Sequence, residues 1–313
     1  MLSLFLQRLL MLVPTVILGT LLIFSIVQIT PGGPAYAIAG ADATPEFVER
    51  INEELGLNDP LPIQYVNWLT DLIQGSFGDS LVSGQPVSDL IWNRLPVTSV
   101  LALETLLVSF IIGLPLGLTA AIRANTGLDG AIRVSSGLGL AIPEFWFGIL
   151  VVNLFALQLF WLPPIGYTPP GDGILSHLRS VILPVATLSL GPIAVITRFT
   201  RSAMIEALEG PYVRTAWALG ISRREVYFRF ALKNAMTSIV TIVGIVATVM
   251  MGGAVLVESL FAIPGLGQLM VTSVLTKDFP VVQGVAVALL ALVIVINFTV
   301  DILVAAIDPR TRT

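Results

Sequence analysis

The chain has 313 residues and no cysteine, and only 12% of its residues are charged, with 16 basic and 20 acidic side chains. More than half of the residues (55%) are apolar, and the mean hydropathy is +0.91. Soluble domains usually have about a quarter charged residues, so this composition excludes a nucleic-acid binder, a disordered tail and an ordinary cytosolic enzyme. The lack of cysteine excludes disulfides, thiolate metal sites and cysteine nucleophiles. Membrane lipid is therefore the solvent for most of the chain.

Six apolar segments are long enough to cross a bilayer core, which takes about 20 residues per helix. They cover residues 9–29, 105–122, 134–161, 181–197, 236–257 and 281–300. The sequence therefore predicts an all-α polytopic membrane protein with six transmembrane helices.

The first apolar run resembles a secretory signal peptide, because Arg8 precedes it and Ala35-Tyr36-Ala37 looks like a small-residue cleavage site. The run has about 21 residues, however, whereas the apolar region of a signal has about 7–15. We therefore expect residues 1–30 to form an uncleaved transmembrane helix, with a cleaved signal as the alternative.

The basic residues predict the orientation of the spans, because cytoplasmic loops have an excess of Lys and Arg. With the N-terminus inside, twelve basic residues fall on the cytoplasmic side and four fall outside. The four outside are Arg50, Arg94, Arg179 and Lys277. We therefore expect both termini in the cytoplasm.

Residues 31–98 form an acidic segment between the first two spans, and residues 99–313 form the core domain with the other five. Thr44-Pro45-Glu46 is typical of a helix start, with an N-cap, a first-turn proline and an acid that the helix dipole favours. Gly56 suits the end of that helix, and Gly75 suits the end of a second amphipathic helix. We expect a compact helical cap outside the membrane.

The acidic side chains of this cap are candidates for docking a partner. The candidates are Glu46, Glu49, Glu53, Asp71 and Asp79. The alternative is a cap that only shields the ends of the spans.

The internal loop over residues 198–233 has seven basic and three acidic residues, which makes it too polar to cross the membrane. Its pattern predicts a short helix over 212–219, closed by Gly220, and a second helix from Arg223 with Val226 and Phe230 on its apolar side. Two short helices joined at a glycine would form a rigid knob at the membrane face. The alternative is that the basic residues only anchor the protein at the cytoplasmic face. Such an anchor needs only positive charge, and it does not need the helical pattern or the glycine of this loop.

Catalytic and nucleotide-binding motifs are missing from the sequence. It has no P-loop, no pair of zinc histidines and no Gly-x-Ser-x-Gly elbow, so the polypeptide cannot hydrolyse ATP by itself. The one histidine, His177, is predicted to lie in an external loop, which excludes a His-dependent serine dyad within the membrane. Glu258 and Asp301 lie at span ends and are expected to be interfacial.

Glu144 is the one acidic residue well inside an apolar run. A straight helix from Val134, with a rise of about 1.5 Å per residue, would place it roughly 15 Å deep. An ionisable group there has to face water, a partner or the bundle interior, and Pro143 would free backbone carbonyls beside it. We expect Pro143 and Glu144, with Pro184 and Pro192 of the fourth span, to line a substrate pathway. The structural alternative is that Glu144 only stabilises a kink, and that Pro184 and Pro192 only bend their helix so that it packs against its neighbours.

Several motifs along the chain resemble, in order and spacing, the membrane permease subunit of bacterial ABC importers of the peptide, dipeptide, nickel and glutathione branch. In the external cap they are Leu55-Gly-Leu-Asn-Asp-Pro-Leu61 and Gly75-Ser-Phe-Gly-Asp-Ser80. In the internal loop they are Tyr212-Val-Arg-Thr-Ala-Trp-Ala-Leu-Gly-Ile221 and Ala231-Leu-Lys-Asn-Ala235. Towards the end they are Val257-Glu-Ser-Leu-Phe-Ala-Ile-Pro-Gly-Leu-Gly267, Asp278-Phe-Pro280, Asn297-Phe-Thr-Val-Asp301 and Asp308-Pro-Arg310.

The resemblance implies a type I importer fold in the bacterial inner membrane, in which residues 201–235 form a coupling segment that inserts into a separate ATPase subunit. The implied coupling residues are Arg214, Thr215, Ala216, Trp217, Leu219, Gly220 and Ile221. Trp217 and Leu219 depart from the Arg and Lys that this branch commonly has, which makes the contact less ionic.

The resemblance also implies the partners and the source of energy. They are a second homologous permease, two ATP-binding subunits that hold ATP and Mg, and an extracytoplasmic substrate-binding protein that faces the acidic cap. The chain itself would be a transport subunit without a cofactor or metal of its own, not an enzyme. Peptides are the favoured cargo, and nickel chelates, glutathione-like thiols and oligosaccharides stay open.

Two other functions compete with this interpretation. An ion-driven secondary transporter would use Glu144 as its proton site and would show inverted repeats, which we do not find between the first and last three spans. An intramembrane hydrolase would need a catalytic set that the sequence lacks.

Overall fold

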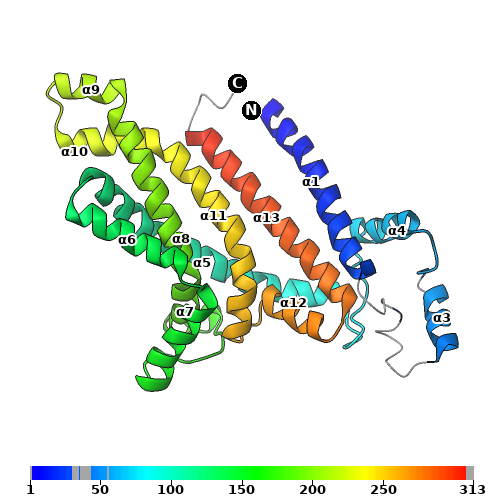
Figure 1. Cartoon of the computed structure of the whole chain (residues 1–313). Helices are drawn as coiled ribbons and strands as arrows, with labels where there is room; N and C mark the ends of the chain where they lie inside the picture. The colour runs from blue at the N-terminus through cyan, green and yellow to red at the C-terminus, as the bar shows by residue number, and fades with distance from the viewer. Residues whose placement is uncertain (1, 30–34, 36–43, 55, 308–313) are drawn as a thin grey trace. The chain divides into compact units, whose positions relative to one another are not determined.

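The computed structural model describes residues 2–29, 35, 44–54 and 56–307, and most of them are helical (Figure 1). The chain forms two compact units, one of Met1–Thr98 with Pro264–Ile294 and one of Ser99–Ile263 with Val295–Thr313. The cleavage-site-like Tyr36-Ala37 and the Asp308-Pro-Arg310 motif lie outside the described residues.

Five helices in the described part of the chain are long and apolar enough to cross a membrane. They are α1 (Leu2–Ile29), α5 (Val87–Ile122), α8 (Ile174–Glu209), the continuous helix Arg223–Leu260 and α13 (Phe279–Ile307). The pair α6 (Gly127–Ala141) and α7 (Glu144–Val151), extended by a π turn over Val152–Gln158, passes as a sixth span when taken together. The all-α, six-span fold class predicted from the sequence is confirmed.

The helices are longer than the apolar runs that predicted them. Helix α5 has 36 residues and begins at Val87, and α8 includes Arg198, Arg201, Glu206 and Glu209, which lie in the predicted internal loop. Hydropathy marks only the apolar part of a helix, whereas the backbone hydrogen bonds continue through polar turns at its ends.

The third predicted span is not one helix, because α6 and α7 meet at a bend of 98°. Ile142, with ψ 123°, and Pro143, with ψ 131°, have extended backbones between them. The ring of a proline disfavours the helical conformation in the residue before it, and its nitrogen cannot donate a helical hydrogen bond. The straight-helix depth that we predicted for Glu144 is therefore wrong.

The first unit holds α1, α3 (Pro45–Glu54), α4 (Leu61–Ile73), α12 (Leu266–Leu275) and the first parts of α5 and α13. As predicted, α3 begins at Pro45, and Gly56 and Gly75 have positive φ just after α3 and α4. The buried core of this unit joins α5, α12 and α13. It consists of Val87, Ile91, Leu266, Leu269, Val281 and Val285.

Two of the family-like motifs meet inside this unit. The hydroxyl of Ser80 donates to Asp278 Oδ2 at 2.5 Å, and the Leu81 N–H donates to Asp278 Oδ1 at 3.1 Å. Ser80 and Asp278 are both buried. This contact fastens the segment before α5 to the turn between α12 and α13.

Helix α8 is central to the second unit, where α6, α7 and α11 (Leu232–Leu260) all pack against it. Ala121, Met204, Ala207, Ala231, Ala235 and Ile239 form its largest described apolar cluster. Glu258 is fully buried in the last turn of α11, at the end of the span where it was predicted to lie. The chain folds back at that point, where the Ile263 N–H binds the carbonyl of Glu258.

Candidate functional site

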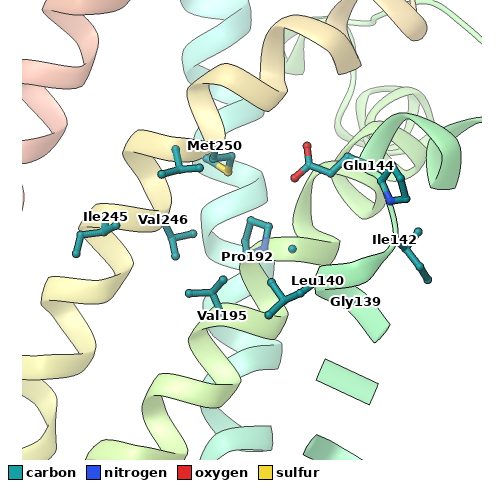
Figure 2. A pocket seen from close by; sticks show the side chains of 12 residues that line it. Gly139, Leu140, Ile142, Glu144, Pro192, Val195, Ile245, Val246 and Met250 are labelled. Atoms are coloured by element: carbon teal, nitrogen blue, oxygen red, sulfur yellow. The ribbon is translucent and has the colours of Figure 1, made fainter. Parts of the chain in front are cut away.

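A cavity of about 420 Å³ lies where α6, α7, α8 and α11 approach one another (Figure 2). Glu144, the first residue of α7, is the one ionisable residue among those that line it. The other lining residues are Gly139, Leu140, Ile142, Pro143, Gly191, Pro192, Val195, Ile245, Val246, Val249 and Met250. We call this cavity the Glu144 pocket.

One glycine makes room for the Glu144 carboxylate, and a second lies beside it. A methyl group added to Gly253 of α11 would lie 2.5 Å from Oε2, and one added to Gly191 of α8 would lie 3.4 Å from Oε1. Figure 2 shows the side chain extending from α7 toward α11. Within the described part of the chain, no hydrogen bond or ion pair to this carboxylate is found. It is therefore available to a ligand group.

Three of the four predicted pathway residues come together in this pocket. Pro143, Glu144 and Pro192 line it, whereas Pro184 is buried in α8 outside the lining. The sequence could not have indicated Gly191 and Gly253, because their role depends on which helices meet.

A second candidate feature is the loop between the two long helices α8 and Arg223–Leu260. Its first part is α9 (Pro211–Ala218), which ends in a Schellman motif: the Gly220 N–H binds the Trp217 carbonyl at 3.0 Å and the Ile221 N–H binds the Ala216 carbonyl at 3.1 Å. Gly220 has the positive φ of 72° that this motif requires. The short helix predicted over 212–219 and its closing glycine are confirmed.

The inner face of α9 is packed and its outer face is free. Val213, Ala216 and Val226 form a buried cluster with Ile221 at its edge. Five of the predicted coupling residues are exposed, and Leu219 is 73% exposed. The five are Arg214, Thr215, Trp217, Leu219 and Gly220. Most of the predicted coupling residues therefore lie on the exposed outer face of this loop, whereas Ala216 is buried on the inner face.

The second short helix predicted from Arg223 does not exist as a separate element. Ser222 caps α10 (Arg223–Glu225), which continues through a π turn (Val226–Ala231) into α11. The apolar side of this segment lies where predicted, because Val226 is fully buried and Phe230 is partly buried. The loop is thus one short helix attached to the start of a long one.

Tyr212 of α9 lies beside the end of α8. Burial, and then the negative charge of Glu206, raise the pKa of the Tyr212 phenol above its ordinary value. The hydroxyl is therefore neutral at physiological pH.

The predicted docking acids are all exposed, but they lie on different elements. Glu46, Glu49 and Glu53 follow one another on α3, where Asn58 donates to Glu49 at 2.8 Å. Asp71 lies on α4, and Asp79 lies in the segment before α5.

His177 is not the surface-loop residue that we predicted. It belongs to the first turn of α8 and is 3% exposed. Its Nε2 lies 2.6 Å from Glu104 Oε1 of α5, and its Nδ1 lies 2.6 Å from the Thr168 carbonyl. The prediction was wrong because α8 begins before the apolar run, and within its first turn His177 is the residue that packs against α5.

Comparison with known proteins supports a transport role for this arrangement. Residues 113–313 match the family model of the binding-protein-dependent transport system inner membrane component, and residues 1–102 match the model of its N-terminal part. A putative peptide transport system permease protein of Brucella abortus is 41% identical over 100% of this chain and 99% of its own length.

Two further relatives are similar over nearly their full lengths. The oligopeptide transport system permease protein AppB of Bacillus subtilis is 37% identical, with 97% of each chain covered. The glutathione transport system permease protein GsiC of Salmonella choleraesuis is 36% identical over 100% of this chain and 99% of its own.

Solved structures of transporters share the fold. An inward-facing structure of the MetNI methionine ABC transporter aligns with a TM-score of 0.58 at 19% identity, covering 70% of this chain and 96% of the other. An amino acid ABC transporter with histidines aligns with a TM-score of 0.52 at 15% identity, covering 71% and 94%.

Proposed function

Because the chain belongs to the family of inner membrane components of binding-protein-dependent transport systems, we propose that it forms one half of the translocation pathway of an ATP-driven peptide importer. The peptide cargo is supported by the names of the Brucella and Bacillus relatives. The ion-driven alternative gains no support from a family whose transport depends on a binding protein.

The observation that carries this proposal is the position of α9 between two long membrane helices. Its inner face is packed against Val226 at the start of one helix and Leu208 near the end of the other. A force on α9 would therefore move α8 and α11, and both helices line the Glu144 pocket.

The outer face of α9 is the proposed contact for a separate ATPase subunit. It offers Trp217 and Leu219 as apolar contacts beside the charge of Arg214. Closing of the ATPase pair around ATP and Mg would bias the permease between inward-open and outward-open states through this surface.

The Glu144 pocket is the proposed section of the substrate pathway in this chain. A carboxylate between apolar walls and glycine backbone attracts a positively charged group, such as the amino terminus of a peptide, while the apolar lining accepts side chains of many shapes. A second homologous permease would complete the pathway from the other side.

The proposed outer partner is an extracytoplasmic substrate-binding protein, which docks on the acids of α3 with Asp71 and Asp79. Complementary charge would steer the encounter and fix its orientation. Both termini of the permease would then lie in the cytoplasm, on the side of the ATPases.

Reconstitution tests the proposed function directly. In liposomes, the lone chain should move no peptide, and the assembly of two permeases, two ATPases and the loaded binding protein should take up peptide only with ATP and Mg. Uphill uptake by the lone chain on a proton or sodium gradient would favour the carrier alternative instead.

Variants of the same assembly test the coupling surface. Gly220→Asp and Arg214→Glu should uncouple peptide-stimulated ATP hydrolysis from uptake. Arg123→Glu is the matched control, because this exposed arginine lies on the predicted cytoplasmic side but outside the loop. Unchanged uptake in both loop variants would contradict the coupling role.

A further inference from the structure

Helix α4 was expected to be part of a cap outside the membrane, but its contacts place it beside a membrane-spanning helix. The Tyr65 hydroxyl lies 2.9 Å from Thr20 Oγ1 of α1, and the Phe24 ring of α1 packs on the rings of Tyr65 and Trp68, with centroids 5.6 and 5.9 Å apart. Nearer the end of α1, Gln28 donates to Gln64 at 2.9 Å. These residues belong to the same compact unit.

The positions of these contacts along α1 give the depth of α4. The candidate span of α1 is Leu12–Ile29. At a rise of about 1.5 Å per residue, Phe24 lies roughly 7–8 Å and Thr20 roughly 13–14 Å from the end of that span. Because α4 packs against these residues, it lies alongside the outer part of the span and not beyond it.

The side chains of α4 point in three directions. Tyr65 and Trp68 face α1, as does Gln64 through Gln28, and Asn67 and Asp71 form a polar stripe at a spacing of four residues. A third side presents Ile63, Val66 and Ile73, which are 48%, 58% and 78% exposed. We call these three residues the outer apolar face of α4.

An apolar face at this depth fits lipid better than water. Interfacial helices sink about 5–10 Å into the boundary between headgroups and acyl chains, and Tyr and Trp are enriched at that level. At the same level of the span, Leu22 and Ile26 on another side of α1 are also apolar and more than half exposed. We infer that α4 is a membrane-interfacial helix whose outer apolar face contacts the acyl chains of the outer leaflet.

The polar stripe would then face the headgroups and water, so Asp71 stays accessible to a docking partner. Helix α3, whose acidic residues are exposed, would then be the part of the cap that lies outside the membrane. This inference concerns lipid contact and does not depend on the cargo or on the proposed coupling.

Spin-label accessibility tests the inference, and the absence of cysteine from the sequence makes single-cysteine labelling straightforward. The full chain would bear a nitroxide at Val66→Cys or at the adjacent Asn67→Cys, in vesicles of phosphatidylethanolamine and phosphatidylglycerol. At Val66→Cys, collision with oxygen should exceed collision with a water-soluble nickel chelate several-fold, and at Asn67→Cys the order should reverse.

Ile73→Cys and Asp71→Cys provide a second matched pair with the same expected contrast. The inference is overturned if the nickel chelate reaches the labels at 66 and 73 as readily as those at 67 and 71, because the face would then be in water. It is equally overturned if both reagents are excluded at 66 and 73, because a protein surface would then cover the face.

Discussion

Arg201 holds the carboxylate of Asp129 through two hydrogen bonds, from Nε at 2.6 Å and from Nη2 at 2.8 Å. The Asp129 side chain is completely buried, and its Oδ2 also accepts the Asn125 N–H at 2.9 Å. The pair joins the first turn of α6 to α8, the helix that leads into α9. It therefore links the helix that leads into the proposed coupling loop to α6, the helix that ends just before Pro143.

Removal of Arg201 is predicted to destabilise the protein strongly. Arg201→Ala would leave Asp129 buried without its partner, and breaking a buried ion pair in this way costs about 3–5 kcal/mol in the free energy of unfolding. Thermal unfolding of the purified permease in detergent measures the loss. Arg133→Ala is the control, because Arg133 is 57% exposed and 3.5 Å from Asp129, so its loss should cost less than about 1 kcal/mol. Equal stability of the two variants would contradict the prediction.

The Schellman motif at Gly220 makes the loop sensitive to a single methyl group. Gly220→Ala would force a residue with a Cβ into the left-handed region, at a cost of about 1–2 kcal/mol. We expect α9 to fray at this end, so that less peptide is taken up per ATP hydrolysed in the reconstituted importer. Gly130→Ala, where a Cβ meets nothing within 4 Å, should leave that ratio unchanged. A normal ratio for Gly220→Ala would mean that the motif is not needed for coupling.

Adjacent glycines on α11 provide a test of the Glu144 pocket. Gly253→Ala places a methyl group 2.5 Å from Glu144 Oε2 and should displace the carboxylate, whereas Gly252→Ala meets nothing within 4 Å. We expect slower peptide uptake for Gly253→Ala and a normal rate for Gly252→Ala, with unchanged affinity of the binding protein for peptide.

Removal of the Glu144 charge should have the same effect as its displacement. Glu144→Gln keeps the size of the side chain, and we expect it to slow uptake of peptides with a free amino terminus. If Glu144→Gln and Gly253→Ala both transport at the wild-type rate, the carboxylate has only a structural role at the bend.

His177 is predicted to contribute to stability. His177→Ala removes the partner of Glu104, whose Oε2 is already buried without a hydrogen bond within the described chain, and unpairing a buried polar group costs about 1–3 kcal/mol. A lower unfolding temperature in detergent is the expected readout. Ser176→Ala, one residue away and exposed, should unfold at the wild-type temperature. A wild-type temperature for His177→Ala would show that water replaces the imidazole.

The sequence predicted correctly those helix ends that are determined by a few consecutive residues. The start of α3 at Pro45, the turns at Gly56 and Gly75 and the Gly220 end of α9 were all predicted, because helix-start residues and left-handed glycines act over one helical turn. The bounds of α5 and α8 were missed, because their polar turns resemble loops when only hydropathy is considered. The break at Pro143 was expected only as a loosening, since a proline can either kink a helix or end it.

By itself the sequence determined that the chain is helical, lies in a membrane and has a capped helix in its basic loop, because apolar run length and capping chemistry are properties of consecutive residues. Only the tertiary structure decided that Gly253 makes room for Glu144, that Arg201 pairs with Asp129 and that Tyr65 reaches Thr20. Each of those contacts joins two helices, and their partners are separated by 45 to 109 positions in the chain. Their distances depend on how helices pack, and no local pattern of residues specifies that packing.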